Sequence, residues 1–263
     1  MINLKTSFHL PLLLLSILFL ATGCATAPEA RITQYSTIDA LLSGVYDGAA
    51  NCAQLRENGD TGIGTFEALD GEMIVLDGTV YQVKIDGEVK KVTPDTKTPF
   101  AVVVPFAADM ELPIEGKSLQ DFEGALTKAL KNPNLFYAIK VHGLFKSVEV
   151  RSVPRQTKPY PPLAEAAKGQ RVFKLENISG TLVGFRCPPL AKGINVPGCH
   201  LHFLSDDKTK GGHVLNFELA GKSAEVDLMS CRELLLVLPP DASGFGSAEL
   251  GIDRSKELQK IEK

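Results

Sequence analysis

The segment from Gly198 to Glu218 constrains the fold of this chain more than any other. Two apolar runs rich in β-forming residues, 198–204 and 213–218, flank a polar turn that ends in two glycines. Apolar runs around a short polar turn with glycine are typical of a β-hairpin. We therefore expect antiparallel strands in this part of the fold.

Three of the five histidines lie in the predicted hairpin. His200 and His202 are two residues apart on one strand, so both side chains point to the same face. A loop centred on Asp207 and Lys208 places His202 opposite His213, and directly opposed residues share a face with Cβ atoms roughly 5 Å apart. Three converging imidazoles are typical ligands of Zn²⁺ or a similar divalent ion that keeps positions open for substrate. The register-matched third histidine favours a metal site over three unrelated histidines at the end of a half-buried sheet.

The N-terminus predicts a targeting segment. Lys5 supplies a positive charge, residues 10–20 form an apolar run, and small residues then lead to Cys24. The apolar run is too short for a standard membrane span. We expect residues 1–24 to be a lipoprotein-like signal peptide with a lipid anchor at Cys24, and an ordinary cleaved signal peptide is the alternative. The protein is then exported, as a periplasmic or membrane-anchored lipoprotein, with residues 25–34 as a tether.

Export permits disulfides among the remaining cysteines. Cys187 and Cys199 flank one loop, so a bond between them stays an open possibility. Cys199 is the strand neighbour of His200 and points to the opposite face, so we do not expect it in the metal site.

The chain is long enough to bury a substantial core, since 44% of its 263 residues are hydrophobic. Its net charge of −3 and the absence of a long basic run argue against a nucleic-acid partner. The glycines between residues 59 and 66 lack the spacing of a dinucleotide or phosphate-binding loop, and they favour strands that bend or approach closely.

The rest of the chain predicts many short strands and few helices. Ser118 begins the clearest helix, with Asp121 at the capping-box position. A proline-rich segment at 159–162 suggests a boundary between lobes at 35–156 and 157–263. Other expected elements are a meander over 69–84, a buried strand over 100–106, two strands within 135–150 joined at His142-Gly143, two strands within 173–185, one or two within 224–238, and helices over 37–44, 163–168 and 253–263.

Several long motifs of this chain resemble the α-acetolactate decarboxylase family. The resemblance covers roughly residue 35 to the C-terminus and includes the hairpin. The motifs that carry it are Gly59 to Val83, Thr98-Pro99-Phe100-Ala101-Val102, Asn134 to Lys140, Arg151-Ser152-Val153-Pro154-Arg155-Gln156, Lys158 to Leu163, and Gly193 to Gly198.

The resemblance implies a set of site residues. Zn²⁺ would be held by the three hairpin histidines, and the site would include Glu72 from the Asp-Gly-Glu motif and Arg151. A further glutamate from the C-terminal tail would complete it; Glu262 fits the ending of the family better, and Glu257 is the other candidate. The implied fold is α/β and β-rich, with two lobes of mixed or antiparallel sheet, few short helices and the metal site between the lobes. A homodimer is also implied.

The activity that the resemblance implies is decarboxylation of a small molecule, (2S)-2-acetolactate, to (R)-acetoin and CO₂ in acetoin and butanediol biosynthesis. Arg151 would hold the substrate carboxylate, while Glu72 or Glu262 would protonate the carbon that loses CO₂. Two departures from the family are Cys199, where tyrosine is common, and the lipoprotein-like signal. The alternatives are a non-catalytic exported zinc-binding lipoprotein and a cupin-like metal oxygenase, which would need a glutamate shortly after the His pair.

Overall fold

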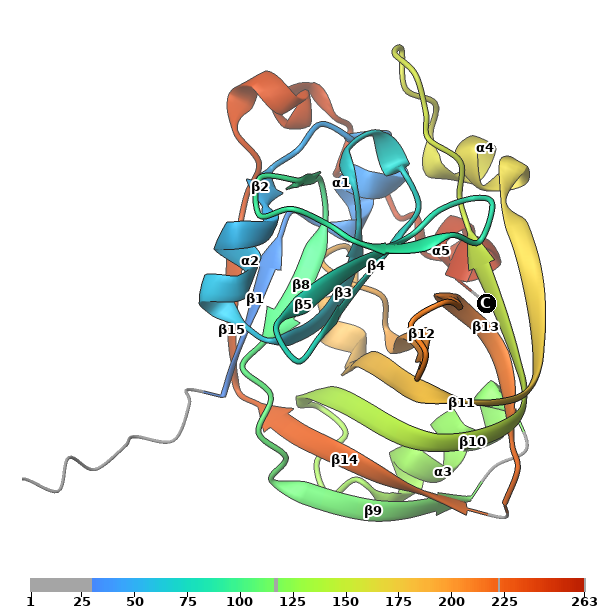
Figure 1. Ribbon diagram of the computed structural model, residues 1–263. Helices are drawn as coiled ribbons and strands as arrows, with labels where there is room; N and C mark the ends of the chain where they lie inside the picture. Colours follow the sequence, from blue (N-terminus) through green and yellow to red (C-terminus); the bar gives the residue numbers. More distant parts are fainter. Residues whose placement is uncertain (1–29, 116–117, 222, 263) are drawn as a thin grey trace, which may run out of the picture.

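Two large β-sheets pack face to face in the computed structural model, which describes residues 30–115, 118–221 and 223–262 (Figure 1). The predicted signal peptide at 1–24 lies outside these residues. The β-rich α/β class expected from the sequence is confirmed, with the three hairpin histidines between the sheets.

The first sheet has seven strands in the order β15-β1-β8-β3-β4-β5-β6. Its first strand begins at Arg31, so residues 31–34 of the expected tether belong to the sheet. The strand bounds are β1 Arg31–Tyr35, β3 Thr61–Thr65, β4 Glu72–Leu76, β5 Thr79–Val83, β6 Val89–Lys91, β8 Ala101–Val104 and β15 Glu233–Val237, and a separate pair joins β2 (Ala50–Asn51) to β7 (Lys97–Thr98).

The second sheet has six strands in the order β11-β12-β13-β10-β14-β9, with a further pairing between β11 and β10. Because β10 pairs with both β11 and β13, the four strands β10, β11, β12 and β13 form a closed ring. The strand bounds are β9 Met110–Glu115, β10 Phe136–Ser152, β11 Arg171–Cys187, β12 Gly198–Ser205, β13 Gly211–Leu219 and β14 Ser223–Cys231.

The prediction of separate strands within 135–150 and within 173–185 is wrong. Residues 136–150 lie inside the continuous 17-residue strand β10, and residues 173–185 lie inside the 17-residue strand β11. His142 and Gly143, expected to form a turn, pair with Thr181 and Gly180 of the neighbouring strand. Pairing along the two long strands supplies the backbone hydrogen bonds that a local turn would otherwise have to provide.

The two sheets do not follow the expected boundary between residues 156 and 157. Strands β9 and β10 precede that boundary and belong to the second sheet, whereas β15 follows it and pairs in parallel with β1 of the first sheet. The proline-rich segment 159–162 connects β10 to β11 within one sheet.

Helices cover the outer faces of both sheets. Helix α2 packs on the first sheet through Cys52 and Leu55, and α3 packs on the second through Phe122 and Leu126. As predicted, Ser118 caps α3 by accepting a hydrogen bond from the Asp121 backbone N–H at 3.1 Å. The helices are α1 Ile38–Leu42, α2 Cys52–Asn58, α3 Leu119–Ala129, α4 Leu163–Ala166 and α5 Ser255–Glu262, with 3₁₀ turns at η1 Glu67–Leu69, η2 Ala167–Gly169, η3 Pro189–Ala191, η4 Asp241–Ser243 and η5 Phe245–Ser247.

The central core lies between the sheets and also takes side chains from α1, α4 and α5. The C-terminal helix α5 confirms the expected helical tail, and it contributes Leu258 and Ile261 to this core. Among the described residues, no helix has the length and apolar character that crossing a membrane requires.

Candidate metal centre and active site

The three histidines of the hairpin converge between the two sheets. His202 of β12 pairs directly with His213 of β13, which confirms the register predicted from the sequence. The ring centroids of His200, His202 and His213 lie 4.9–5.3 Å from one another. One nitrogen from each ring lies within 4.8 Å of the others, and all three side chains are buried.

Gly212 brings β13 close to β10 beside this triad. Its φ of +145° is a backbone conformation that residues with a side chain rarely adopt. A Cβ atom at this position would also lie only 2.5 Å from the carbonyl oxygen of Arg151. Arg151 and His213 are direct partners in the pairing of β10 with β13. The glycine therefore allows the arginine and the histidine to lie side by side on the face that points between the sheets.

Burial keeps the three imidazoles neutral. It lowers the pKa of His200 to about 3, with a further contribution from the Arg151 charge. Burial lowers the pKa of His202 and of His213 well below the ordinary value in the same way. Neutral imidazoles are the form that binds metal ions.

A hydrogen bond fixes the orientation of one ring. His202 Nδ1 lies 2.8 Å from the carbonyl oxygen of Met73, so Nδ1–H donates and Nε2 keeps its lone pair. Metal-binding histidines usually donate their second ring N–H to a carbonyl or carboxylate in this manner. The carbonyl of Met73 in β4 thus orients the His202 ring so that its free Nε2 faces the centre. Glu72 lies in the same strand.

Several buried polar atoms of the site have no hydrogen-bond partner among the described residues. They are His200 Nδ1, His213 Nε2, Glu72 Oε1, Arg151 Nε and Glu262 Oε2. Buried polar atoms without partners are rare in folded proteins and indicate a missing ion, water or ligand. Imidazole nitrogens with a nearby carboxylate match the ligand preference of Zn²⁺, so the residues present fit a bound zinc ion.

Two glutamates and an arginine surround the triad. Glu262 Oε1 lies 3.2 Å from Arg151 Nη2, and Glu262 Oε2 lies 3.4 Å from His200 Nε2. Glu72 Oε2 approaches His202 Nε2 to 3.9 Å. The structure thus brings together all six residues expected at the site.

The tail glutamate at the centre is Glu262, not Glu257. Glu262 is 8% exposed. Glu257, in the first turn of α5, instead forms an ion pair at 3.0 Å with Arg254, which precedes the helix.

Both glutamates are held toward their protonated form. Burial raises the pKa of Glu72 to about 7; the Arg151 charge opposes this rise and the Glu262 charge adds to it. Burial also raises the pKa of Glu262, against the favourable charge and hydrogen bond of Arg151. Glu72 can therefore carry a proton near neutral pH, and the pKa of Glu262 is shifted in the same direction.

Apolar residues that form no recognisable motif in the sequence line the same cavity as the histidines and are called the apolar wall. Its residues come from the helices α1 and α4, the η1 turn and two loops, and they are Ile38, Leu41, Leu69, Phe100, Val153 and Leu163. The sequence could not distinguish this wall, because apolar residues that line a cavity show the same pattern as core residues. Thr65 also lines the site and donates a hydrogen bond of 2.6 Å to the Gly71 carbonyl, next to Glu72.

Arg155, His142 and the two cysteines of the predicted loop lie away from the centre. Arg155 forms a half-exposed ion pair with Asp70 at 3.5 Å, and His142 lies on the surface 3.2 Å from Asp206. Cys187 packs in the core between the sheets, while Cys199 packs in the core on the opposite face. The two thiols therefore point to opposite faces of one sheet, which excludes the disulfide left open above and keeps Cys199 out of the metal centre.

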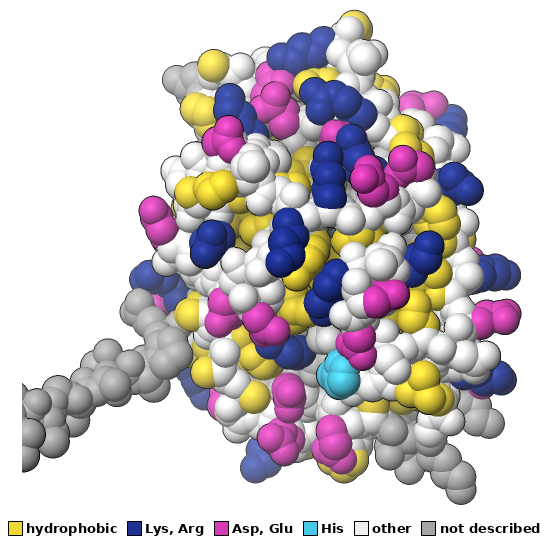
Figure 2. Space-filling view, viewed as in Figure 1, with side chains coloured by type: hydrophobic (Ala, Val, Ile, Leu, Met, Phe, Trp, Pro, Cys, Tyr) yellow, Lys and Arg dark blue, Asp and Glu magenta, His cyan; other side chains and the backbone are white. Residues whose placement is uncertain are grey.

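Figure 2 shows the side chains on one face of the molecule. On this face Lys and Arg side chains intermingle with Asp and Glu, and hydrophobic side chains are visible between them. No large area of one charge sign stands out in this view.

Comparisons with known proteins give a consistent result. The sequence profile of the family described as alpha-acetolactate decarboxylase matches residues 32–252. The chain is 49% identical over 231 residues to the alpha-acetolactate decarboxylase of Methanosarcina mazei, covering 88% of this chain and 79% of that one. It is 39% identical over 248 residues to the enzyme of the same name from Bacillus subtilis strain 168, covering 94% and 96%.

A solved structure agrees with these sequence matches. The crystal structure of alpha-acetolactate decarboxylase from Bacillus subtilis strain 168 superposes with a TM-score of 0.84 at 40% identity. The superposition covers 88% of this chain and 99% of that one. At this identity and coverage the likeness extends over both sheets.

Proposed function

The chain belongs to the alpha-acetolactate decarboxylase family, and from that premise we propose that it converts (2S)-2-acetolactate to (R)-acetoin and CO₂. The proposed cofactor is Zn²⁺, and the proposed pathway is the formation of acetoin and butanediol. The observation that carries the proposal is the convergence of a buried carboxylic acid, Glu72, and a buried cation, Arg151, on three neutral histidines. These groups match what the loss of CO₂ from a β-keto acid requires.

Decarboxylation leaves an electron pair that must be accommodated. When the bond between C1 and C2 breaks, its electrons form a double bond between C2 and C3, and the C3 carbonyl oxygen becomes negative. His200, His202 and His213 would hold the zinc ion, which as a Lewis acid would polarise the substrate oxygens and stabilise that developing charge. Neither thiamine nor pyridoxal chemistry is needed for this step.

Arg151 is proposed to bind the substrate carboxylate. It is 3% exposed, and its guanidinium already lies beside a carboxylate, that of Glu262. An arginine fork binds a carboxylate with charge-assisted hydrogen bonds and so fixes the direction of the breaking bond. The apolar wall around Leu69 and Leu163 excludes water and offers contacts for the two methyl groups.

Glu72 is proposed as the proton donor to C2. Its pKa of about 7 keeps a large fraction protonated at neutral pH, which suits a general acid. Protonation of C2 from one side only gives a single enantiomer of acetoin. Glu262, whose pKa is also raised, is the second carboxyl group from which a proton can come.

The experiment that tests the proposal is acetoin formation from racemic acetolactate by purified, zinc-loaded protein, followed colorimetrically with and without a chelator. We expect acetoin in the zinc-loaded sample and none after chelation. A zinc-loaded, folded sample that forms no acetoin would support the alternative of a non-catalytic zinc-binding lipoprotein. The presence of both Glu72 and Arg151 at the centre argues against that alternative, since zinc storage needs neither.

We further propose that the protein is exported and anchored through a lipid on Cys24. The support is the positive residue, the short apolar run and the small residues before the cysteine. A homodimer, implied by the family resemblance, is proposed on that ground alone.

A further inference from the structure

The cavity at the metal centre is too small for the proposed substrate. This metal cavity, bounded by the three histidines, Glu72, Arg151 and Glu262, has a volume of about 30 Å³. A single water needs about 10–15 Å³ by this measure, so there is room for one or two waters. Acetolactate has nine non-hydrogen atoms, and therefore some group must move before it can bind.

Glu262 is the group that stands in the way. Its carboxylate contacts Arg151 Nη2 at 3.2 Å, which is the contact proposed for the substrate carboxylate. Both carboxylates cannot hold the same guanidinium edge. Glu262 ends α5, whose buried residues are Leu258, Ile261 and Glu262. Because the ends of helices fray, its side chain can turn away more readily than one in the middle of a strand.

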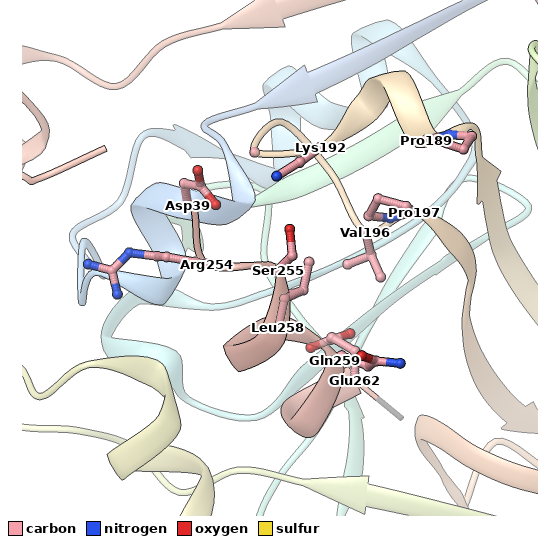
Figure 3. A pocket seen from close by; sticks show the side chains of 11 residues that line it. Asp39, Pro189, Lys192, Val196, Pro197, Arg254, Ser255, Leu258, Gln259 and Glu262 are labelled. Atoms are coloured by element: carbon pink, nitrogen blue, oxygen red, sulfur yellow. The ribbon is translucent and has the colours of Figure 1, made fainter. Parts of the chain in front are cut away.

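A second, larger cavity lies on the other side of Glu262. This side cavity, of about 350 Å³, is formed between α5 and the loop 189–197 (Figure 3). Ser255, Leu258, Gln259 and Glu262 line it from the helix, as the close-up shows. Its volume falls within the range of small-molecule sites, and Glu262 lines both this cavity and the metal cavity.

The side cavity has walls suited to a small hydroxy-keto acid. Its charged lining residues are Arg254, Lys192, Asp39 and Glu262. Arg254 pairs with Glu257 at 3.0 Å and Lys192 with Asp253 at 2.8 Å, but the Nε of Arg254 is buried without a hydrogen-bond partner among the described residues and can donate to a bound carboxylate. Pro189, Val196 and Leu258 offer apolar surface for methyl groups. The side cavity thus offers one free donor for the carboxylate of acetolactate and apolar surface for its methyl groups.

The loop wall of this cavity is held firmly. Asn195 Nδ2 donates to Gln34 Oε1 at 2.8 Å, and Gln34 Nε2 donates to the Ile194 carbonyl at 2.7 Å. Both bonds tie the loop to β1 of the first sheet. Movement that joins the two cavities is therefore expected in Glu262 and the last turn of α5, not in the loop.

We propose that the side cavity is a first binding site for the substrate, from which acetolactate reaches the metal cavity when its carboxylate displaces that of Glu262 from Arg151. This inference rests on the proposed function. A third cavity of about 510 Å³, the far cavity, lies on the opposite side of α5 between Ala164, Lys168 and Lys260. It shares no lining residue with the metal cavity, so it is the matched control for the side cavity.

The test uses the absence of tryptophan from this chain. Gln259→Trp places a single fluorophore on the exposed face of α5 in the side cavity, and Lys168→Trp places one at the far cavity. Each variant is titrated with 2-hydroxy-2-methylbutanoate, a hydroxy acid that lacks the ketone and cannot lose CO₂. We expect a saturable fluorescence change for Gln259→Trp, with or without zinc, and none for Lys168→Trp.

Steady-state kinetics complete the test. Because the new indole narrows the side cavity, Gln259→Trp should show about tenfold lower kcat/KM with normal zinc content, while Lys168→Trp keeps the wild-type value. A saturable response at the far cavity only, or wild-type kcat/KM in folded Gln259→Trp, would overturn the proposal. If the wild-type protein makes no acetoin but the Gln259→Trp titration saturates, the proposed reaction fails while the binding site stands.

Discussion

The carboxylate of Glu262 lies 3.2 Å from the guanidinium of Arg151, although 111 residues separate them along the chain. Both side chains are buried, and each is the principal charged partner of the other. This ion pair joins the last turn of α5 to the strand that runs beside His213. It links the stability of the C-terminal helix to the geometry of the candidate active site.

Glu262→Gln should lower both stability and turnover. Breaking a buried ion pair leaves an uncompensated charge, so the free energy of unfolding should fall by about 3 kcal/mol. We expect kcat to fall at least ~100-fold, since a carboxyl group at the reacting centre is lost. Urea unfolding and steady-state kinetics measure the two effects. Glu257→Gln is the control, and it should change the unfolding free energy by no more than about 1 kcal/mol because its pair with Arg254 is partly exposed. Equal effects of the two substitutions would contradict the placement of Glu262 at the site.

His202→Ala and Glu72→Gln should separate metal binding from proton transfer. His202→Ala removes a proposed ligand, so zinc and activity should be lost together. Glu72→Gln keeps the three imidazoles but cannot donate a proton, so it should retain zinc while kcat falls by ~10²–10⁴-fold. Metal analysis of dialysed protein, paired with an acetoin assay, measures both. Normal turnover by Glu72→Gln would show that another group supplies the proton.

The raised pKa of Glu72 predicts how the stability of the metal-free protein depends on pH. The folded pKa is about 7 and the ordinary value is 4.5, so the folded state binds this proton more tightly than the unfolded state. The protonated Glu72 therefore contributes to the free energy of unfolding. This contribution is fully present below pH 4.5 and is lost as the pH rises through about 7. The loss amounts to about 3 kcal/mol. Urea unfolding from pH 4.5 to 8 should show this decline as a difference between wild type and Glu72→Gln, which lacks the titrating group. Parallel curves for the two proteins would contradict the shift.

Gly212→Ala should destabilise the fold at the triad. The new Cβ would lie 2.5 Å from the Arg151 carbonyl oxygen, at a φ of +145° that other residues rarely adopt. We expect a loss of about 1–3 kcal/mol, measured by urea unfolding, together with weaker zinc binding. Gly124→Ala is the matched control, because Gly124 is exposed within α3 and its added Cβ would meet no atom within 4 Å. That control should be stabilising by about 0.5–1 kcal/mol.

Cys24→Ser should abolish lipid attachment without altering the folded enzyme. The proposed anchor needs the thiol, whereas the first described strand begins only at Arg31. Expression in a bacterial host with labelled fatty acid should show label in the wild type and none in the variant. Labelled Cys24→Ser protein would rule out this cysteine as the anchor, and unlabelled wild type would favour an ordinary cleaved signal peptide.

Local features of the sequence were sufficient to predict that the three histidines of the metal triad lie together. The period of two along a strand sets His200 beside His202, and the turn length sets His213 opposite His202. Both are short-range rules that hold wherever the hairpin lies. The helix caps at Thr37 and Ser118 were predictable for the same reason, since each depends on a backbone N–H three residues away.

Tertiary structure decided the length of the strands and the membership of the sheets. His142-Gly143 carries a local turn signal, yet pairing with Thr181 and Gly180 of β11 holds both residues in strand β10. Strand β15 lies beside β1 of the first sheet, far from its neighbours in sequence. Such pairings arise between segments distant in the chain, where local propensity has no influence on the partner.

The sequence by itself thus determined three histidines on one face of a hairpin. Only the tertiary structure decided that Glu72, Arg151 and Glu262, from three distant parts of the chain, meet these histidines in a buried space. Packing of α5 against the central core places Glu262 there, and exclusion of water raises the pKa of both glutamates. The physical reason is that strand period and turn length act over a few residues, whereas burial and charge proximity depend on the whole folded chain.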